Sequence, residues 1–213
     1  MNLLECLVGL GLCLALLSPL LKTSADLATK QIQYEKTQAL IAEGDRALEL
    51  IGRAIRMAGY RNISSGGLRS NTVDTKQFIH VEKKQGIHGS DFLRTHHGFS
   101  GQTDYDCIGN PITLDRTKHQ MAYQGFMVGQ SAAIPKGVKN QSGSLICQSL
   151  DRQGRVQNTT LMNGIDQLKV DEMTFPQSLS GQRQKRYRVQ LRLTDGRSLY
   201  VNVERTFTTR NLL

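Results

Sequence analysis

The sequence predicts an α+β protein in which one long N-terminal helix packs on an antiparallel β-sheet. Three observations support this class. Residues 1–21 are apolar apart from one charge, residues 26–60 carry apolar side chains at helical spacing, and apolar and polar residues alternate with a period of two after residue 66. A helical stretch followed by a run of strands is typical of α+β proteins. We therefore expect a transmembrane or assembly helix (1–25), an amphipathic helix that packs on the sheet (26–60) and a β-rich globular domain (61–213).

The apolar run at the N-terminus contains a single charged residue, Glu5. At a rise of ~1.5 Å per residue, a helix over residues 1–21 reaches about 31 Å, the thickness of a hydrocarbon core. A carboxylate placed there costs about 3 kcal/mol unless it finds a partner. Nothing else in the segment can neutralise it except a terminal amine, and the chain's own amine is too close along the helix axis to pair well. We therefore expect the helix to assemble beside similar helices, with Glu5 paired to a neighbouring copy's amine.

Two simpler explanations fit the apolar run less well. A secretory signal peptide cleaved after Thr23-Ser24-Ala25 would need a positively charged start, and the sequence has an acid there instead. A plain uncleaved membrane anchor fits the hydropathy but does not require Glu5.

The second helical stretch has an apolar stripe with a seven-residue repeat, formed by Leu27, Tyr34, Ile41, Leu48 and Ile55. The stripe is richer from Ala39 to Ala58, so we expect that half to face the sheet. Pro19 is expected to kink the junction between the two stretches, and Gly59 is expected to stop the helix.

Period-two alternation predicts a series of strands in the second part of the chain. They are Phe78–Glu82, Ser90–Thr95, Met121–Val128, Leu145–Leu150, Arg155–Leu161 and Gln167–Met173. The clearest unit comes last, where Tyr187–Leu193 and Leu199–Val203 should form a hairpin around a two-residue Asp195-Gly196 turn. The stretches 97–110 and 135–144 are expected to be long loops.

The composition limits the function without defining it. Hydrophobic residues make up 38% of the chain, which suits one modest, loop-rich domain. A net charge of +9 favours anionic partners. Cys6 and Cys13 are interpreted as small apolar residues of the N-terminal helix. Cys107 and Cys147 would form a disulfide in an oxidising compartment, with a stabilisation of about 4 kcal/mol.

Catalysis and metal binding have little support. The sequence has no nucleophile elbow, phosphate-binding glycine loop or metalloprotease helix motif, so we expect neither an enzyme nor a cofactor. The histidines (His80, His88, His96, His97 and His119) lack zinc-site spacing and are interpreted as solvated loop residues. Asp104-Tyr105-Asp106 could hold a calcium ion, but the segment lacks the rest of an EF-hand, and we interpret its two acids as turn-forming residues.

Three arginines are candidates for contact with an anionic ligand. Arg186, Arg188 and Arg192 should lie on one face of a strand with Tyr200 nearby, an arrangement that could bind phosphates of DNA. The alternative is a polar sheet face turned to water or to an acidic partner. We favour this alternative because phosphate binding usually needs further basic contacts along a groove.

The first eight residues, Met1-Asn2-Leu3-Leu4-Glu5-Cys6-Leu7-Val8, resemble the start of mature type IV pilins and their secretion-system relatives. The resemblance implies that the numbering begins at the mature N-terminus, that a short basic leader has been removed, and that Met1 is N-methylated. Position 1 is Met where that family usually has Phe, and its apolar run does not usually contain two cysteines.

Three further segments resemble the PilW-like minor pilins: Arg56–Arg61, Gly164–Val170 and Phe207–Leu212. This resemblance implies a pilin-like fold and a subunit anchored in the bacterial inner membrane by one span, with its C-terminal domain in the periplasm. It implies incorporation near the tip of a type IV pilus, where the subunit primes assembly with other minor pilins and a large adhesin. Twitching, adhesion or DNA uptake would follow. A J-type pseudopilin of type II secretion and a membrane-tethered periplasmic DNA-binding module are the alternatives.

Overall fold

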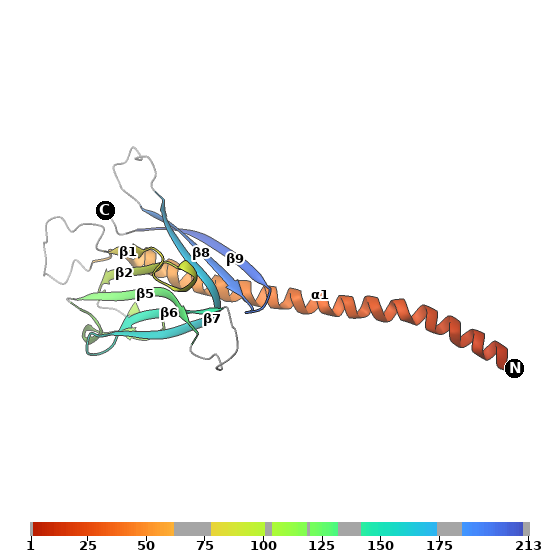
Figure 1. The fold of residues 1–213 in the computed structure, drawn as a ribbon. Coiled ribbons are helices and arrows are strands. Elements are labelled where there is room, and N and C mark those ends of the chain that lie inside the picture. Colours follow the sequence, from red (N-terminus) through yellow and green to blue (C-terminus); the bar gives the residue numbers. More distant parts are fainter. Residues whose placement is uncertain are drawn as a thin grey trace. The chain divides into compact units, whose positions relative to one another are not determined.

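The computed structural model describes residues 2–61, 78–100, 104–118, 120–131, 142–173 and 185–210. It contains one long helix, α1 (Leu3–Met57), a seven-stranded antiparallel sheet and a two-stranded ribbon (Figure 1). The predicted class is confirmed: this is a pilin-like α+β arrangement with a long apolar N-terminal helix and a large antiparallel sheet. The chain divides into two compact units, Met1–Ala39 and Leu40–Leu213, which are described in turn.

The first unit is helical from Leu3 onward. α1 continues across Pro19 without interruption, so Pro19 does not end the helix. A proline removes one backbone hydrogen bond, and the bonds on either side keep the flanking turns helical. The side chains of Leu27 and Tyr34 are exposed, so the first half of the predicted stripe is not covered within the chain.

The second unit is built on the sheet, whose strand order is β1-β2-β5-β6-β7-β8-β9. The strands are β1 (Ile79–Glu82), β2 (Phe92–Gly98), β5 (Met121–Gln130), β6 (Gly143–Leu150), β7 (Val156–Met173), β8 (Arg186–Thr194) and β9 (Tyr200–Thr208). The remaining elements are the ribbon strands β3 (Asp104–Tyr105) and β4 (Pro111–Ile112) and the short helices η3 (Ile87–Gly89) and η4 (Leu114–Arg116).

The prediction of separate strands at Arg155–Leu161 and Gln167–Met173 is wrong, because both belong to β7. The first part of β7 pairs with β6, and the part from Ile165 onward pairs with β8 across a register shift. Gly164, next to that shift, has φ +78°, and a Cβ there would lie 2.9 Å from the carbonyl oxygen of Thr194. The glycine therefore allows β7 to bend, so that its first part pairs with β6 and its second part pairs with β8.

The predicted two-residue turn between the last strands is also wrong. β8 ends at Thr194 and β9 begins at Tyr200, so the loop spans residues 195–199. The Oδ1 atom of Asp195 accepts hydrogen bonds from three backbone N–H groups at 2.9–3.2 Å, those of Arg197, Ser198 and Leu199. This local bonding stabilises a wider loop than the dipeptide alone indicates.

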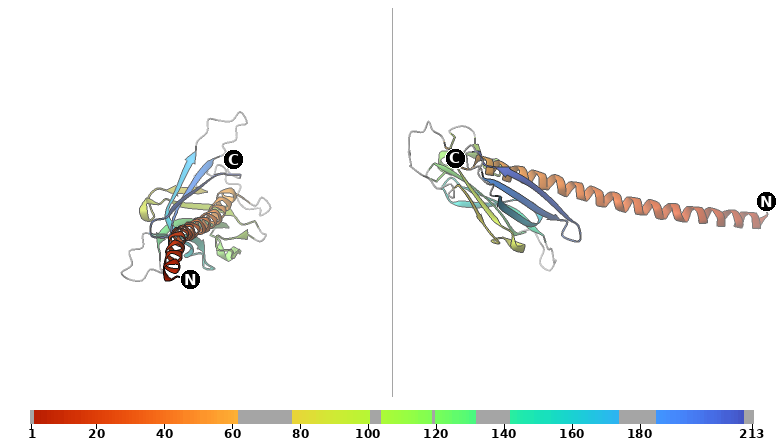
Figure 2. Two further views of the ribbon diagram at one scale, coloured as in Figure 1. Left: turned by 90° about the vertical axis from the view of Figure 1, so that its right-hand side faces the viewer. Right: turned by 90° about the horizontal axis from the view of Figure 1, so that it is seen from above.

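The C-terminal part of α1 packs against the sheet, as the richer stripe after Ala39 predicts (Figure 2). Its buried residues are Gly44, Ala47, Leu48, Ile51, Gly52, Ala54 and Ile55. Small residues let the last hairpin approach closely: a Cβ at Gly44 would meet Val203 at 2.8 Å, and one at Gly52 would overlap the Phe207 ring. The helix ends at Met57, and Gly59 follows with φ +78°, the left-handed conformation typical of a helix stop.

The predicted loop at residues 97–110 is partly regular, because β2 extends to Gly98 and the ribbon strand β3 follows. The other predicted loop, at residues 135–144, lies mostly outside the described residues.

Candidate functional site: the apolar helix and Glu5

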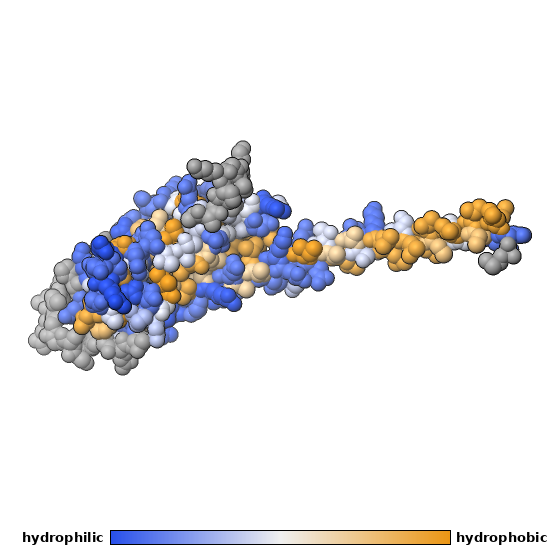
Figure 3. Space-filling model, turned by 90° about the horizontal axis from the view of Figure 1, so that it is seen from below, coloured by the Kyte–Doolittle hydropathy of each residue, from blue (hydrophilic) through white to orange (hydrophobic). Residues whose placement is uncertain are grey.

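The N-terminal stretch of α1 is largely apolar on the face drawn in Figure 3. An 18-residue window of the helix has a mean hydropathy of 2.1 and is 0% buried, so the helix is long and apolar enough to cross a membrane. The large exposed side chains are Leu3, Leu4, Leu7, Val8, Leu10, Leu12, Leu14, Leu16, Leu17, Leu20 and Leu21. A patch this large marks a membrane or a protein interaction site. This surface is therefore suited to a membrane or to contact with another protein.

Glu5 lies in the first turn of this helix and has a partner within its own chain. Its Oε2 atom accepts a hydrogen bond from the backbone N–H of Asn2 at 3.1 Å. Asn2 precedes the first helical residue, so Glu5 at the third helical position closes one half of a capping box. A negative charge in the first turn also interacts favourably with the helix dipole. Sequence reasoning missed this contact, although the Asn-x-x-Glu spacing signals it.

Capping leaves the charge of Glu5 in place. The hydrogen bond from Asn2 occupies one of the carboxylate oxygens, and Glu5 still carries the only charge among residues 2–21. A neutral backbone donor offsets part of the desolvation penalty, whereas a cation offsets the charge itself. Met1, the other predicted assembly and modification residue, lies outside the described residues.

Cys6 and Cys13 are free thiols on the exposed surface of the same helix. They are seven residues apart and so lie on roughly the same side. Their interpretation as small apolar side chains stays a prediction.

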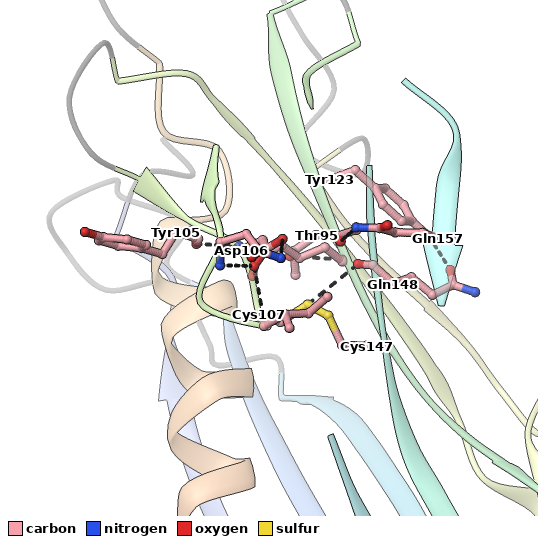
Figure 4. Close-up of a disulfide and its surroundings, with 12 residues drawn as sticks. Thr95, Tyr105, Asp106, Cys107, Tyr123, Cys147, Gln148 and Gln157 are labelled. Atoms are coloured by element: carbon pink, nitrogen blue, oxygen red, sulfur yellow. Dashed lines mark hydrogen bonds between the residues drawn. A yellow bond between two sulfur atoms is a disulfide. The ribbon is translucent and has the colours of Figure 1, made fainter. Parts of the chain in front are cut away.

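The second pair of cysteines forms a disulfide in the sheet unit. Cys107 and Cys147 are bonded, with Cα atoms 6.2 Å apart and a sequence separation of 40 (Figure 4). Both side chains are buried. The bond joins the loop after β3 to the centre of β6, so it ties the ribbon to the main sheet.

Asp106, beside this disulfide, has a structural role. Its Oδ1 atom accepts from the backbone N–H groups of Ile108 (3.0 Å) and Asn110 (2.8 Å), and its Oδ2 atom forms an ion pair with Arg116 (2.9 Å). Both side chains are largely buried, and Arg116 also donates to the carbonyl oxygens of Leu150 and Pro111. Asp104 accepts from the backbone N–H of Ser100. These bonds favour the turn interpretation, and the described residues contain no acidic, His or Cys cluster that could hold a metal ion.

The three candidate arginines lie on β8, on the side of the sheet away from its buried residues. The Arg192 guanidinium forms a bidentate ion pair with the buried carboxylate of Asp166 and lies 5.6 Å from the centre of the Tyr200 ring. Arg188 stands opposite Asp171 on β7. Neighbouring acids therefore offset part of the positive charge, which weakens the case for a phosphate-binding stripe.

The histidines are not a set of solvated loop residues: that interpretation is wrong for His80, which lies in β1, and for His96 and His97. His96 and His97 belong to β2, and the His97 side chain is buried. Burial is the largest effect on the pKa of His97 and lowers it. The charge of Asp104 opposes this effect, whereas His96 and Arg53 lower the pKa further. His97 is therefore a neutral core residue at pH 7. His119 lies outside the described residues.

The fold and the site together define a class: a pilin-like α+β protein with an apolar N-terminal helix that carries one acid in its first turn. No family model matches the chain, and neither a characterised protein nor a solved structure shows significant similarity to it.

Proposed function

We propose that this protein is a minor pilin: it is anchored in the bacterial inner membrane by α1 and is then incorporated into a type IV pilus near its tip. The observation that carries this proposal is the uncovered apolar surface of residues 3–21 with Glu5 as its only charge. The resemblance of the first eight residues to mature type IV pilins supports it. The partners would be other minor pilins, reached through the N-terminal helix, and a large tip adhesin.

The mechanism is packing combined with electrostatics. In the membrane, lipid covers the leucine-rich surface, and in the filament the helices of neighbouring subunits replace that lipid. Glu5 then moves from a partly solvated interface to a protein interior, where an unpaired charge is strongly unfavourable. The positive N-terminal amine of an adjacent subunit supplies the missing counter-charge.

The disulfide supports the location of the sheet unit on the oxidising side of the membrane. Structural disulfides persist in the periplasm and outside the cell and are rare in the cytosol. A buried bond between Cys107 and Cys147 is therefore consistent with a periplasmic domain.

Substitutions at Glu5 test the proposal and separate the two functions of the carboxylate. Glu5→Gln keeps an oxygen that can accept the Asn2 hydrogen bond but removes the charge, whereas Glu5→Leu removes both. We expect both variants to reach the membrane at wild-type levels and to co-purify with partner pilins at least ~10-fold less well, the effect of losing about 1.4 kcal/mol or more. The readouts are membrane fractionation and co-purification of tagged subunits.

Glu35→Gln is the matched control, because Glu35 lies exposed on α1 outside the apolar run and accepts a hydrogen bond from Gln31. It should assemble normally. Normal assembly of Glu5→Gln would contradict the proposal.

A further inference from the structure

In its described part, the main sheet has open strand edges that include the outer edge of β1, the C-terminal half of β7 on the side away from β8, the N-terminal half of β7 on the side away from β6, and the outer edge of β9. An open edge presents unpaired backbone groups that can pair with another chain, and proteins usually shorten or cover such edges. These edges differ in how they are protected.

The first two edges are protected. β1 is only four residues long. The open half of β7 is covered by residues 83–91, here called the β7 strap. The strap makes four hydrogen bonds to the backbone of Leu168 and Val170 in β7. Ser90 Oγ accepts from Leu168 N–H (3.2 Å), and Asp91 Oδ2 accepts from Val170 N–H (2.9 Å). Asp91 N–H donates to the Leu168 carbonyl (2.8 Å), and Lys83 Nζ donates to the Val170 carbonyl (2.6 Å).

The pairing of β8 with β9 shows which backbone groups of β9 point outward. At one end Asp195 N–H donates to the Leu199 carbonyl, and at the other Thr209 N–H donates to the Lys185 carbonyl. Hydrogen-bonded pairs alternate along an antiparallel ladder, so the odd-numbered residues of β9 bond to β8. The N–H and C=O groups of Asn202, Glu204 and Thr206 therefore point away from β8.

This outer edge is long and regular, and no described segment pairs with it. β9 has nine residues, contains no proline, and pairs with β8 without a register shift. Asn202, Glu204 and Thr206 are exposed, and within the described ranges their backbone groups make no hydrogen bond beyond the sheet. Among the described residues, neither a short strand length nor a covering strap protects this edge as they protect β1 and the C-terminal half of β7.

The side chains of β9 indicate which strand would fit beside it. On the row facing α1, Val201 and Val203 are half-buried, and Arg205 is exposed and forms ion pairs with Asp45 and Glu49 of α1. On the outer row Glu204 is exposed. β8, the strand on the other side, has buried apolar residues on the inner row and arginines and Gln190 on the outer row, where Gln190 bonds Glu204. A second copy of β9 has no basic residue on its outer row and would bring a second Glu204. A strand with basic residues on its outer row therefore complements Glu204 better than a second copy of β9 does.

We propose that the outer edge of β9 is a strand-addition site, which binds an extended segment of another polypeptide with apolar residues beside Val201 and Val203 and basic residues outward. Main-chain hydrogen bonds from Asn202, Glu204 and Thr206 supply affinity, and the two side-chain rows supply specificity. This inference stands on the sheet alone and does not depend on the proposed function.

Hydrogen exchange of the purified full chain in detergent micelles tests whether the edge is open. We expect the amides of Asn202, Glu204 and Thr206 to exchange at least ~10-fold faster than those of Val203 and Arg205, because only the latter are bonded to β8. Equal protection of both sets in the monomer would overturn the proposal. So would a dimer whose formation protects the even-numbered amides, because the occupant would then be a second copy.

A synthetic peptide with the sequence of β8, Arg186–Thr194, serves as the binding probe because it carries the expected alternation. Thr206→Pro removes one outward N–H without touching the β8 ladder, a position where an edge strand tolerates proline. We expect Thr206→Pro to weaken binding at least ~10-fold in fluorescence anisotropy and the control Thr206→Ala to change it less than ~2-fold. If Thr206→Pro does not fold, the peptide affinities of Asn202→Pro and Asn202→Ala are compared in the same way. Equal affinity of the proline and alanine variants, or no binding by the wild type, would overturn the proposal.

Discussion

Arg116 is the residue whose loss should affect the stability of the sheet unit most clearly. It pairs with a buried carboxylate, and removal of one partner of a buried pair leaves an uncompensated charge. We expect Arg116→Met to lower the free energy of unfolding by about 3 kcal/mol, measured by urea denaturation of the full chain in detergent.

The matched control is Arg155→Met. Arg155 forms an ion pair with Asp151 at a comparable distance, 3.0 Å against 2.9 Å, but its side chain is 75% exposed against 12% for Arg116. An exposed pair contributes about 0–1 kcal/mol. Similar losses of unfolding free energy in Arg116→Met and Arg155→Met would show that burial of the ion pair does not determine its contribution to stability.

His97 should make the stability of the folded chain depend on pH. Its pKa is lower in the folded protein than the ordinary 6.5, because burial disfavours the charged ring. As pH falls through about 6.5 the unfolded chain takes up a proton that the folded chain does not, so stability is present above this pH and is lost below it.

We therefore expect wild-type protein to lose up to about 1.4 kcal/mol through His97 for each pH unit below about 6.5, until the lowered pKa is reached. His97→Gln should show a smaller difference between pH 7.5 and 5.5 in urea titrations. His80→Gln, at an exposed histidine of β1, should keep the wild-type difference. An unchanged pH dependence in His97→Gln would contradict this account.

At the scale of elements, the contact between α1 and β9 depends on a glycine. A methyl group at Gly52 would overlap the buried Phe207 ring, whereas at Gly44 it would meet only the ends of the Val203 and Leu193 side chains. Overpacking lowers the free energy of unfolding by about 1–3 kcal/mol. The higher helix propensity of alanine raises it by up to about 1 kcal/mol.

We expect Gly52→Ala to destabilise the protein by about 1–2 kcal/mol and Gly44→Ala to have a smaller effect, measured by thermal or urea unfolding. Phe207→Leu should reduce the cost of Gly52→Ala in a double-mutant cycle, because it removes the ring that the methyl group meets. Additive effects would show that the two residues are not in contact.

The disulfide is the covalent link between the ribbon and the sheet. Closing a loop of this length stabilises a fold by about 4 kcal/mol in the chain-entropy model. We expect Cys107→Ser with Cys147→Ser to lower the free energy of unfolding by several kcal/mol, whereas the same change at Cys6 and Cys13 should leave unfolding of the sheet unit unchanged. Equal stability of the oxidised and reduced wild-type protein would contradict this expectation.

At the scale of the whole molecule, the sequence predicts the fold class well because its two periodicities occupy separate stretches. The apolar run and the stripe after Ala39 predict α1, and alternation predicts most strands near their observed positions. The joining of two predicted strands into β7 was missed because it depends on Gly164 and on a register shift, which alternation does not encode. The wider loop after β8 was missed because Asp195 bonds three amides rather than forming a tight turn.

The candidate site was only partly predictable. A lone acid in an apolar run is visible in the sequence, and so is the Asn-x-x-Glu spacing that lets Glu5 cap its helix. The Asp106–Arg116 pair and the burial of His97 were not, because both depend on how separate segments meet around β6 and β2. Long-range contacts of this kind leave no local pattern in the chain.

The central claim is that Glu5 is tolerated in an apolar helix because it pairs with another chain's positive end. A cryo-electron microscopy structure of the assembled complex tests it most directly. We predict that the Glu5 carboxylate lies within about 4 Å of the N-terminal nitrogen of an adjacent subunit, with the leucine-rich surface of α1 covered by neighbouring helices. An assembly in which Glu5 contacts only Asn2 of its own chain, with the apolar helices apart from one another, would contradict the claim.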